Sequence, residues 1–260
     1  MKRTTATAPI ALALLAACAS SPPPAADPDV PLRLLVYNIR HGAGIDGVVD
    51  LERVADIIRT SGANLVLLQE VDEGTQRSGG VDQPAALAEL CGMDQRFAPH
   101  REFDEGRYGL AALTNLPIRS FEVVSLPPPE LELSALELVV EVSGREVVVA
   151  GCHLVQTPEQ RLAQARYLLD RYEDETRPVV MGGDLNSERT SDVLSTLYTR
   201  FDVPEARGPH LTYPANAPVK EIDFVLLSPR GRWRVGEHAV LDEPVASDHR
   251  PVLLEASYPR

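Results

Sequence analysis

The sequence predicts an α/β (α+β) domain in which two mixed sheets pack face to face and helices cover their outer sides. The chain has 260 residues, enough for one large domain with a sizeable core. Its opening has a β, α, β order, and its middle is rich in β-branched runs separated by Pro, Gly and Asn. Strands on both sides of this middle, with helices between some of them, favour two packed sheets.

The first elements are predicted from hydrophobic spacing. A strand is expected over 32–39 and a second over 65–69, where the sequence reads LVLLQ. Between them Leu51, Val54 and Ile58 recur at helical spacing, which predicts a helix over 51–59. A further helix is expected over 84–90.

The later elements follow the same rules. The helix predicted over 158–172 is the clearest, because Thr157 is a good N-cap, Pro158 suits the first helical position, and one face is apolar. The VSGREV segment at 142–147 is typical of a hairpin turn. There is no internal repeat. Strands are expected over 108–113, 118–124, 136–142, 147–154, 179–181, 223–227, 233–240 and 252–256.

The N-terminal segment is predicted to be a secretory signal over 1–17. Lys2 and Arg3 precede an apolar stretch that ends in small residues and is shorter than the ~20 residues of a membrane-spanning helix. LAAC resembles a bacterial lipoprotein signal, which implies that Cys18 carries a lipid; ordinary cleavage nearby is the alternative. A Pro/Ala-rich tether is expected over 18–31, before a catalytic domain over 32–260.

Charge and cysteine content narrow the class of protein. Without Lys2 and Arg3 the chain has 23 basic and 38 acidic residues, a net of −15, which disfavours non-specific polyanion binding as the main task. It does not exclude a nuclease with a local cation at its site. Cys91 and Cys152 lack metal-ligand spacing, and no disulfide is expected between them.

Three polar clusters abut apolar runs, so we expect them at strand ends. They are GGDLNS at 182–187, EIDFVLLS at 221–228 and SDH at 247–249. Carboxylates, an amide and an imidazole are the groups that phosphoester cleavage requires, and strand ends present such groups on a rigid scaffold.

These clusters belong to a longer series that resembles the endonuclease/exonuclease/phosphatase superfamily in order and spacing. The resemblance covers the chain from Leu32 to the C-terminus, and a chance match of seven motifs in order is implausible. It implies a four-layer α/β/β/α sandwich that cleaves phosphoesters with a divalent metal, as in deoxyribonucleases. The motifs are LVYNIRHG at 35–42, LLQEVD at 67–72, YGLAAL at 108–113, CHL at 152–154, GGDLNS, IDFVLL and SDHRPV.

The resemblance implies a metal site formed by Asn38, Glu70 and Asp248. Glu70 follows a buried strand, where an unpaired carboxylate is costly unless a metal or another partner compensates it. Asp248 adds a second carboxylate, and Asn38 supports the metal or a phosphate oxygen through its amide. Oxygen ligands of this kind suit Mg²⁺ or Mn²⁺.

The catalytic residues implied by the resemblance are His153, Asp184, Asn186, Asp223 and His249. Asp184 aligns the attacking water and Asn186 binds a phosphoryl oxygen. His249 accepts a proton or, when protonated, hydrogen-bonds the scissile phosphate, and Asp223 orients it. His153 contacts another phosphate oxygen, although a satisfied core histidine is its alternative interpretation.

Two further residues are predicted to bind substrate. Tyr108 lines the cleft by resemblance, against the alternative of simple packing. Arg77, in a Gly-rich loop, can bind a phosphate bidentately, against the alternative of a solvated charge. Loops at 72–84, 99–107 and 204–219 are expected to set the substrate, with the last as a cleft wall.

The sequence thus predicts an exported, lipid-anchored, Mg²⁺- or Mn²⁺-dependent phosphodiesterase or phosphatase that uses in-line attack by water. The substrate is a small phosphoester, a phospholipid headgroup or a nucleic acid, and the first two are favoured. We expect a monomer, with no protein partner evident, held on a bacterial envelope membrane and facing the periplasm or exterior. The alternative is a non-catalytic envelope lipoprotein that binds a phosphorylated ligand with the same fold.

Overall fold

A computed structural model describes residues 31–259 of the chain. The predicted signal over 1–17, the lipidation site Cys18 and all but the last residue of the predicted tether lie outside this range. Within it, no helix is both long enough and apolar enough to cross a membrane.

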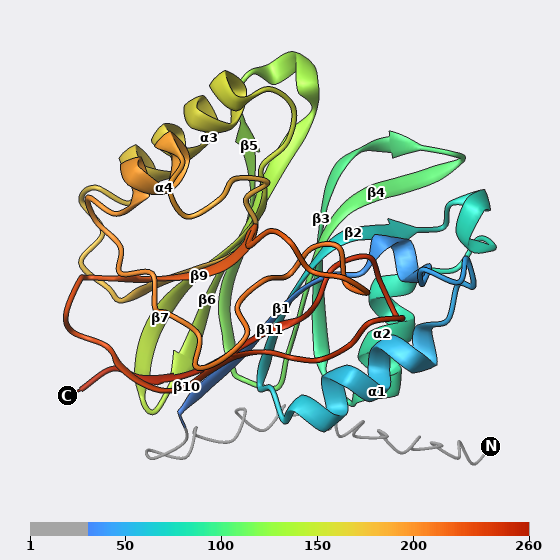
Figure 1. Cartoon of the computed structure of the whole chain (residues 1–260), viewed down its shortest axis with the longest axis horizontal. Coiled ribbons are helices and arrows are strands. Elements are labelled where there is room, and N and C mark those ends of the chain that lie inside the picture. Colours follow the sequence, from blue (N-terminus) through green and yellow to red (C-terminus); the bar gives the residue numbers. More distant parts are fainter. Residues whose placement is uncertain (1–30, 260) are drawn as a thin grey trace, which may run out of the picture.

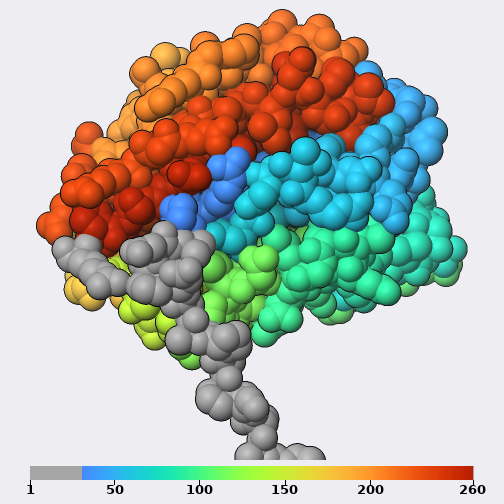
Figure 2. Space-filling view, turned by 90° about the horizontal axis from the view of Figure 1, so that it is seen from below, coloured from blue at the N-terminus to red at the C-terminus, as the bar shows by residue number. Residues whose placement is uncertain are grey.

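One sheet has six strands in the order β10, β11, β1, β2, β4, β3. β1 runs parallel to β2 and antiparallel to the C-terminal strand β11, so the two ends of the described chain are neighbours in this sheet (Figures 1 and 2). Its strands are β1 (Leu32–Asn38), β2 (Leu65–Glu73), β3 (Asp94–Phe103), β4 (Gly106–Thr114), β10 (Arg234–Val240) and β11 (Val252–Ser257).

The other sheet has five strands in sequential order. β7 and β8 are parallel, and the remaining neighbours are antiparallel. Its strands are β5 (Ile118–Leu126), β6 (Leu133–Val142), β7 (Arg145–His153), β8 (Val179–Asp184) and β9 (Asp223–Ser228). The turn between β6 and β7 confirms the hairpin predicted from VSGREV.

Helices cover the outer faces of both sheets (Figure 1). They are α1 (Leu51–Ser61), α2 (Gln83–Cys91), α3 (Pro158–Arg171) and α4 (Asp192–Leu197), and short 3₁₀ turns lie at η1 (Arg40–Gly42), η2 (Gln76–Ser78) and η3 (Pro129–Leu131). Thr157 caps α3 with a full capping box, because its side chain accepts from Gln160 N–H while the Gln160 side chain accepts from Thr157 N–H.

The strand pattern explains the four layers. Along β1, Leu34 and Val36 belong to the cluster between the sheets, whereas Leu35 and Tyr37 pack in the cluster beneath α1 and α2. A third cluster lies between the five-stranded sheet and the helices α3 and α4. Because successive residues of a strand face opposite sides, a continuous apolar strand builds two adjacent core layers. The predicted α/β/β/α sandwich is confirmed.

Two elements were missed. Strand β3, which overlaps the predicted loop 99–107, lies at the edge of its sheet and carries Pro99 and several charged residues, so it lacks clear alternation. Helix α4 has six residues and is too short for a reliable periodic signal. The two cysteines are free, as expected, and Cys152 is buried.

Candidate active site at the ends of the two sheets

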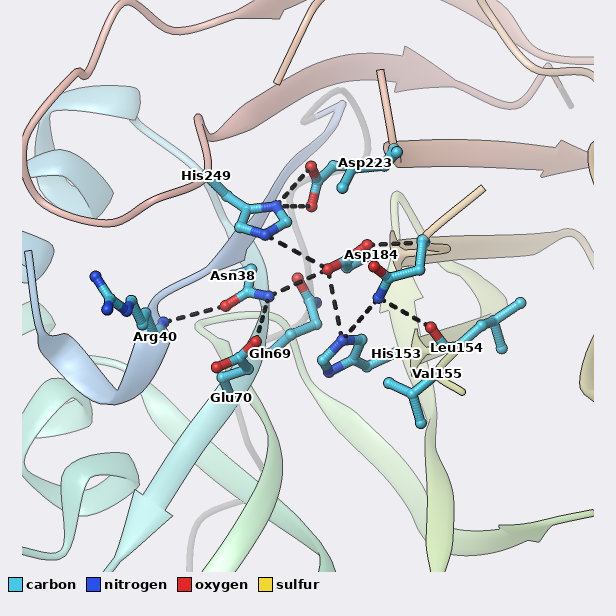
Figure 3. A network of polar contacts seen from close by, with 12 residues as sticks. Asn38, Arg40, Gln69, Glu70, His153, Leu154, Val155, Asp184, Asp223 and His249 are labelled. Carbon is cyan, nitrogen blue, oxygen red and sulfur yellow. Dashed lines mark hydrogen bonds and ion pairs between the residues drawn. The ribbon is translucent and has the colours of Figure 1, made fainter. Parts of the chain in front are cut away.

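The strand order brings the predicted polar residues to one edge of the sandwich (Figure 3). β7 and β8 are parallel and end side by side, so His153 is the register partner of Asp184. β9 is antiparallel to β8 and starts at this same edge, where Asp223 is opposite Asp184. From the other sheet, β1 ends at Asn38. The predicted metal and catalytic residues together therefore come from both sheets.

Asn38 connects the two sheets through its side-chain amide. Its Nδ2 donates to Glu70 Oε1 at 3.0 Å and to Asp184 Oδ2 at 3.2 Å, while its Oδ1 accepts from the backbone N–H of Arg40 at 3.1 Å (Figure 3). The residue is fully buried. In this orientation the amide holds two carboxylates at a fixed spacing, and the metal-ligand role of Asn38 stays a prediction.

Glu70 and Asn186 have left-handed backbone conformations, with φ of 58° and 47°. Glu70 lies inside β2, not after it, where the pairing with β4 shifts register between Leu68 and Val71. A bulge of this kind redirects a side chain. Positive φ costs a residue with a side chain on the order of 1 kcal/mol or more, and such residues cluster at functional sites.

Asp184 lies between two histidines. Its Oδ2 is 3.5 Å from His153 Nε2 and 3.7 Å from His249 Nε2, and its Oδ1 accepts from the Asn186 N–H at 2.8 Å. The carboxyl is almost fully buried. Burial and the nearby charge of Asp223 raise the pKa of Asp184 to about 6, which is suitable for proton transfer near neutral pH.

His249 is held by Asp223, whose two oxygens lie 3.0 and 3.2 Å from its Nδ1. Burial lowers the pKa of His249. The charge of Asp223, its hydrogen bond and the charge of Asp184 together outweigh this effect and raise the pKa to about 10. The ring of Tyr213 packs against the imidazole with centroids 4.9 Å apart. His249 is therefore oriented, with Nε2 directed toward Asp184.

His153 and Asn186 meet on the other side of Asp184. Asn186 Nδ2 lies 3.1 Å from His153 Nε2 and donates to the Leu154 carbonyl at 3.0 Å. His153 is buried. The five predicted catalytic residues thus lie together in one cluster, although their individual roles stay predictions.

Arg77 is not directed at this cluster. Its Nε and Nη2 donate to the two oxygens of the buried Asp72 at 2.8 and 2.7 Å, and its guanidinium packs over the ring of Phe103. Asp72 therefore engages the donors that the sequence suggested for a phosphate, and the substrate-binding role of Arg77 stays a prediction. A buried carboxylate needs such a partner.

Tyr108 lies beside the Arg77 pair. Its ring contacts His100 and Phe103 edge-on, with centroids 5.7 and 6.3 Å apart. Burial, and next the charge of Glu70, raise the pKa of its hydroxyl. These contacts fit the packing interpretation of Tyr108, and its substrate-binding role stays a prediction.

A cavity of about 820 Å³ opens over the cluster. It extends from Glu70 and Asp248 to the start of α3 and to the segment 187–193. The predicted wall 204–219 contributes Tyr213. Its titratable lining consists of six carboxylates (Glu70, Glu159, Asp184, Glu188, Asp192 and Asp248), one arginine and one lysine (Arg161 and Lys220), and two histidines (His153 and His249).

Two groups of residues have metal-ligand chemistry. Asp184, Asp223 and His249 offer ligand atoms within 4.8 Å of one another. Glu70 and Asp248 line the same cavity, and their carboxylates are lightly engaged: Asn38 binds Glu70, Ser247 Oγ lies 3.3 Å from Asp248 Oδ1, and Arg40 Nε lies 4.0 Å from Asp248 Oδ2. Glu70 and Asp248 offer only oxygen atoms as ligands, which fit a hard divalent cation.

Sequence reasoning missed Tyr213 and Lys220 as cleft residues. Tyr213 carried no motif, and its contact with His249 depends on a loop whose path the sequence did not define. Lys220 could have been noticed by its rarity, because Lys2 is the only other lysine in the chain.

Comparisons with known proteins agree with this fold. The model of the Endonuclease/Exonuclease/phosphatase family matches residues 35–249. An endonuclease/exonuclease/phosphatase from Beutenbergia cavernae is 25% identical with a TM-score of 0.70, over 88% of this chain and 72% of that chain.

Two more distant structures share the fold. A mannosyl-6-phosphatase from Bacteroides thetaiotaomicron is 15% identical with a TM-score of 0.71, over 87% of this chain and 100% of that chain. The catalytic domain of human nocturnin, solved with a bound sulfate, is 20% identical with a TM-score of 0.68, over 90% of this chain and 96% of that chain.

Proposed function

Because the chain belongs to the Endonuclease/Exonuclease/phosphatase family, we propose that it is a divalent-metal-dependent hydrolase of phosphoester bonds that uses water as the nucleophile. The observation that carries the proposal is the position of Asp184. This buried carboxylate, with a pKa raised to about 6, lies between the Nε2 atoms of two histidines at the base of an open cavity.

Asp184 is the proton acceptor for the attacking water. Its raised pKa keeps it basic enough to take a proton near neutral pH, and the Asn186 N–H fixes the orientation of its carboxyl group. The buried thiol of Cys152 is no competing nucleophile, because burial raises its pKa to about 12. Direct attack by water therefore suits this site better than a covalent intermediate.

The histidines and Asn186 bind the phosphoryl group. His249, charged and oriented by Asp223, presents Nε2 as a donor to a phosphate oxygen. Asn186 and His153 act on the opposite side of Asp184. Donors fixed before the reaction stabilise the charge that develops on the phosphoryl oxygens.

Glu70 and Asp248 are the residues that would hold the metal, as Mg²⁺ or Mn²⁺. When bound there, such an ion supplies charge to polarise a phosphoryl oxygen. Asn38 positions Glu70 for this role. The Asp184, Asp223 and His249 group suits acid and base chemistry better, because the imidazole Nδ1 is already committed to Asp223.

Small phosphoesters are favoured over nucleic-acid polymers as substrates. Six carboxylates line the cavity against three cationic side chains, Arg161, Lys220 and the charged His249, so a long polyanion would meet net repulsion along this surface. Both diesters and monoesters remain compatible with the site.

We also propose that the protein is exported and anchored by a lipid on Cys18, from the LAAC sequence alone. Metabolic labelling with a fatty-acid analogue, in the full chain and in Cys18→Ser, tests this. Label that persists in Cys18→Ser contradicts the proposal.

The activity is tested with an aryl phosphodiester and an aryl phosphomonoester in the presence of Mg²⁺ or Mn²⁺. We expect turnover that EDTA abolishes and that Asp184→Asn lowers by about 10²- to 10⁴-fold, the usual contribution of a catalytic base. Glu188→Gln is the matched control, because it removes an exposed carboxylate from the same cavity. Metal-independent turnover, or equal losses in both variants, contradicts the proposal.

A further inference from the structure

Lys220 is the single lysine among residues 31–259. Apart from the histidines, every other basic residue in this range is an arginine. It lines the active-site cavity and is exposed. Among the described residues, no carboxylate lies within ion-pair distance of its ammonium group, whereas most arginines of the chain pair with an acid or an aromatic ring. A solvated ammonium group that faces a catalytic cavity is available to a ligand.

The backbone fixes where Lys220 lies relative to the reaction centre. Residues Tyr213 and Lys220 form an antiparallel bridge, with the Lys220 N–H donating to the Tyr213 carbonyl at 2.9 Å and the Tyr213 N–H donating back at 3.1 Å. Residues paired in this way project side chains on the same side. Tyr213 packs on His249, so Lys220 is next to a residue that contacts the imidazole.

Arg161 has a comparable place beside Asn186. Its Nε donates to Ser187 Oγ at 3.1 Å, and its Nη1 donates to the Gln156 carbonyl. Its Nη2 has no protein partner in the described part of the chain. The guanidinium is thus oriented by contacts with the residue before the N-cap of α3 and with the segment after β8, and Arg161 lines the cavity.

We propose that Lys220 and Arg161 bind a second anionic group of the substrate, on the organic part that carries the scissile phosphate. The inference rests on the proposed function and specifies its substrate class: a small phosphoester that carries one further phosphate, phosphonate or carboxylate group. Lys220 is bridged to Tyr213, which packs on His249, and Arg161 contacts Ser187, the residue after Asn186. These two are the only Lys or Arg side chains among the residues that line the cavity.

The other charges of the cavity limit this class. Glu159, Glu188 and Asp192 lie along the wall formed by α3, α4 and the segment before α4. A substrate with several anions would meet these carboxylates, whereas one additional anion can be held by the two cations. Tyr213 offers an aromatic surface between the reaction centre and Lys220.

The test uses a matched series in which only the distal group differs: phenyl phosphate, 4-carboxyphenyl phosphate and 4-(phosphonomethyl)phenyl phosphate, or their methyl diesters. The purified full chain is expected to prefer at least one anionic probe in kcat/KM, and the two anionic probes distinguish carboxylate from phosphonate recognition. Lys220→Met or Arg161→Met should lower this preference about tenfold or more through KM, the effect of losing a charge-assisted hydrogen bond.

Three comparisons make the result specific. Lys220→Arg should retain most of the preference, and Arg166→Met, which removes an exposed cation from α3 outside the cavity, should leave it unchanged. Turnover of phenyl phosphate should also be unchanged in Arg166→Met. Equal kcat/KM for all probes, or a preference that survives both Met variants, overturns the inference while leaving the hydrolase proposal intact.

A second readout does not require turnover. Acetylation of Lys220 is followed by peptide mass spectrometry, which separates its peptide from that of Lys2, the other lysine of the chain. We expect 4-(phosphonomethyl)phenylphosphonate, with Mg²⁺ present, to slow this acetylation several-fold more than phenylphosphonate does. Equal acetylation rates at all ligand concentrations overturn the inference, even if the aryl phosphates are not substrates.

Discussion

Asp223 places both of its carboxylate oxygens within 3.2 Å of Nδ1 of His249, and this contact orients the imidazole toward Asp184. The two residues are 26 positions apart in the sequence. They meet because β9 begins, and the segment before β11 ends, at the same edge of the sandwich. Several tests follow from this contact and its neighbours.

Asp223→Asn should lower the pKa of His249 by more than about one unit in metal-free protein, because it removes the charge that raises this pKa to about 10. Side-chain ¹⁵N NMR titration in EDTA measures the shift directly. The variant should also lose activity by about 10²- to 10⁴-fold, since a misoriented imidazole is a poor catalyst. An unchanged His249 titration would show that Asp223 does not control the imidazole.

Asn38→Ala should weaken activation by Mg²⁺ or Mn²⁺ by about 10- to 100-fold, the usual effect of removing a residue that positions a metal ligand. The expectation follows from the hydrogen bond of Asn38 Nδ2 to Glu70 Oε1. Activity as a function of metal concentration gives the apparent affinity, and calorimetry with Mn²⁺ checks it without substrate. If metal affinity is unchanged, Asn38 does not position Glu70.

Gly183→Ala should destabilise the protein by about 1–3 kcal/mol, the range for an overpacked core position. A Cβ at Gly183 would lie 1.8 Å from the Cys152 carbonyl oxygen, so β7 and β8 would have to separate next to His153 and Asp184. Urea unfolding measures the free energy of unfolding. Gly144→Ala, in the turn between β6 and β7, is a steric control because its Cβ meets nothing within 4 Å, although its positive φ adds a smaller cost.

His100 should make stability fall with acid. Burial, followed by the charges of His153 and Arg101, lowers its pKa to about 3, and Ser134 N–H donates to its Nδ1 at 3.0 Å. Below the unfolded pKa of about 6.5 the unfolded state binds more protons. The His100 contribution is therefore fully present above pH 6.5 and declines as the pH falls toward 3, by up to ~1.4 kcal/mol per pH unit.

His100→Asn tests this prediction, because the amide oxygen can still accept from Ser134 N–H. The difference in unfolding free energy between the variant and the parent should shrink from pH 7 to pH 4, as measured in urea at several pH values. The exposed His210→Asn is the matched control and should show no such trend. A constant difference for His100→Asn would mean that its burial does not affect its titration.

Local sequence patterns predicted most strands, the long helices and the polar residues that gather at one edge of the sandwich. Residues such as Asp184, Asp223 and His249 stand at the ends of apolar runs, and alternation along those runs predicts which layer each side chain enters. These signals are local. A capping residue such as Thr157 acts within one helical turn, so its effect is readable without knowledge of the fold.

Which polar groups pair with each other became visible only in the folded chain. Arg77 had the sequence context of a phosphate ligand, yet Asp72, buried by the pairing of β2 with β4, takes its donors. The left-handed conformation of Glu70 depends on a register shift against that same strand.

The place of Lys220 in the cavity was equally unreadable, because it depends on the backbone bridge to Tyr213, whose ring packs on His249. Contacts between residues far apart in the chain depend on the register and packing of whole sheets, and no local pattern encodes them. The residues of the proposed active site were therefore readable from the sequence, whereas the packing of the two sheets sets which of them line the cavity.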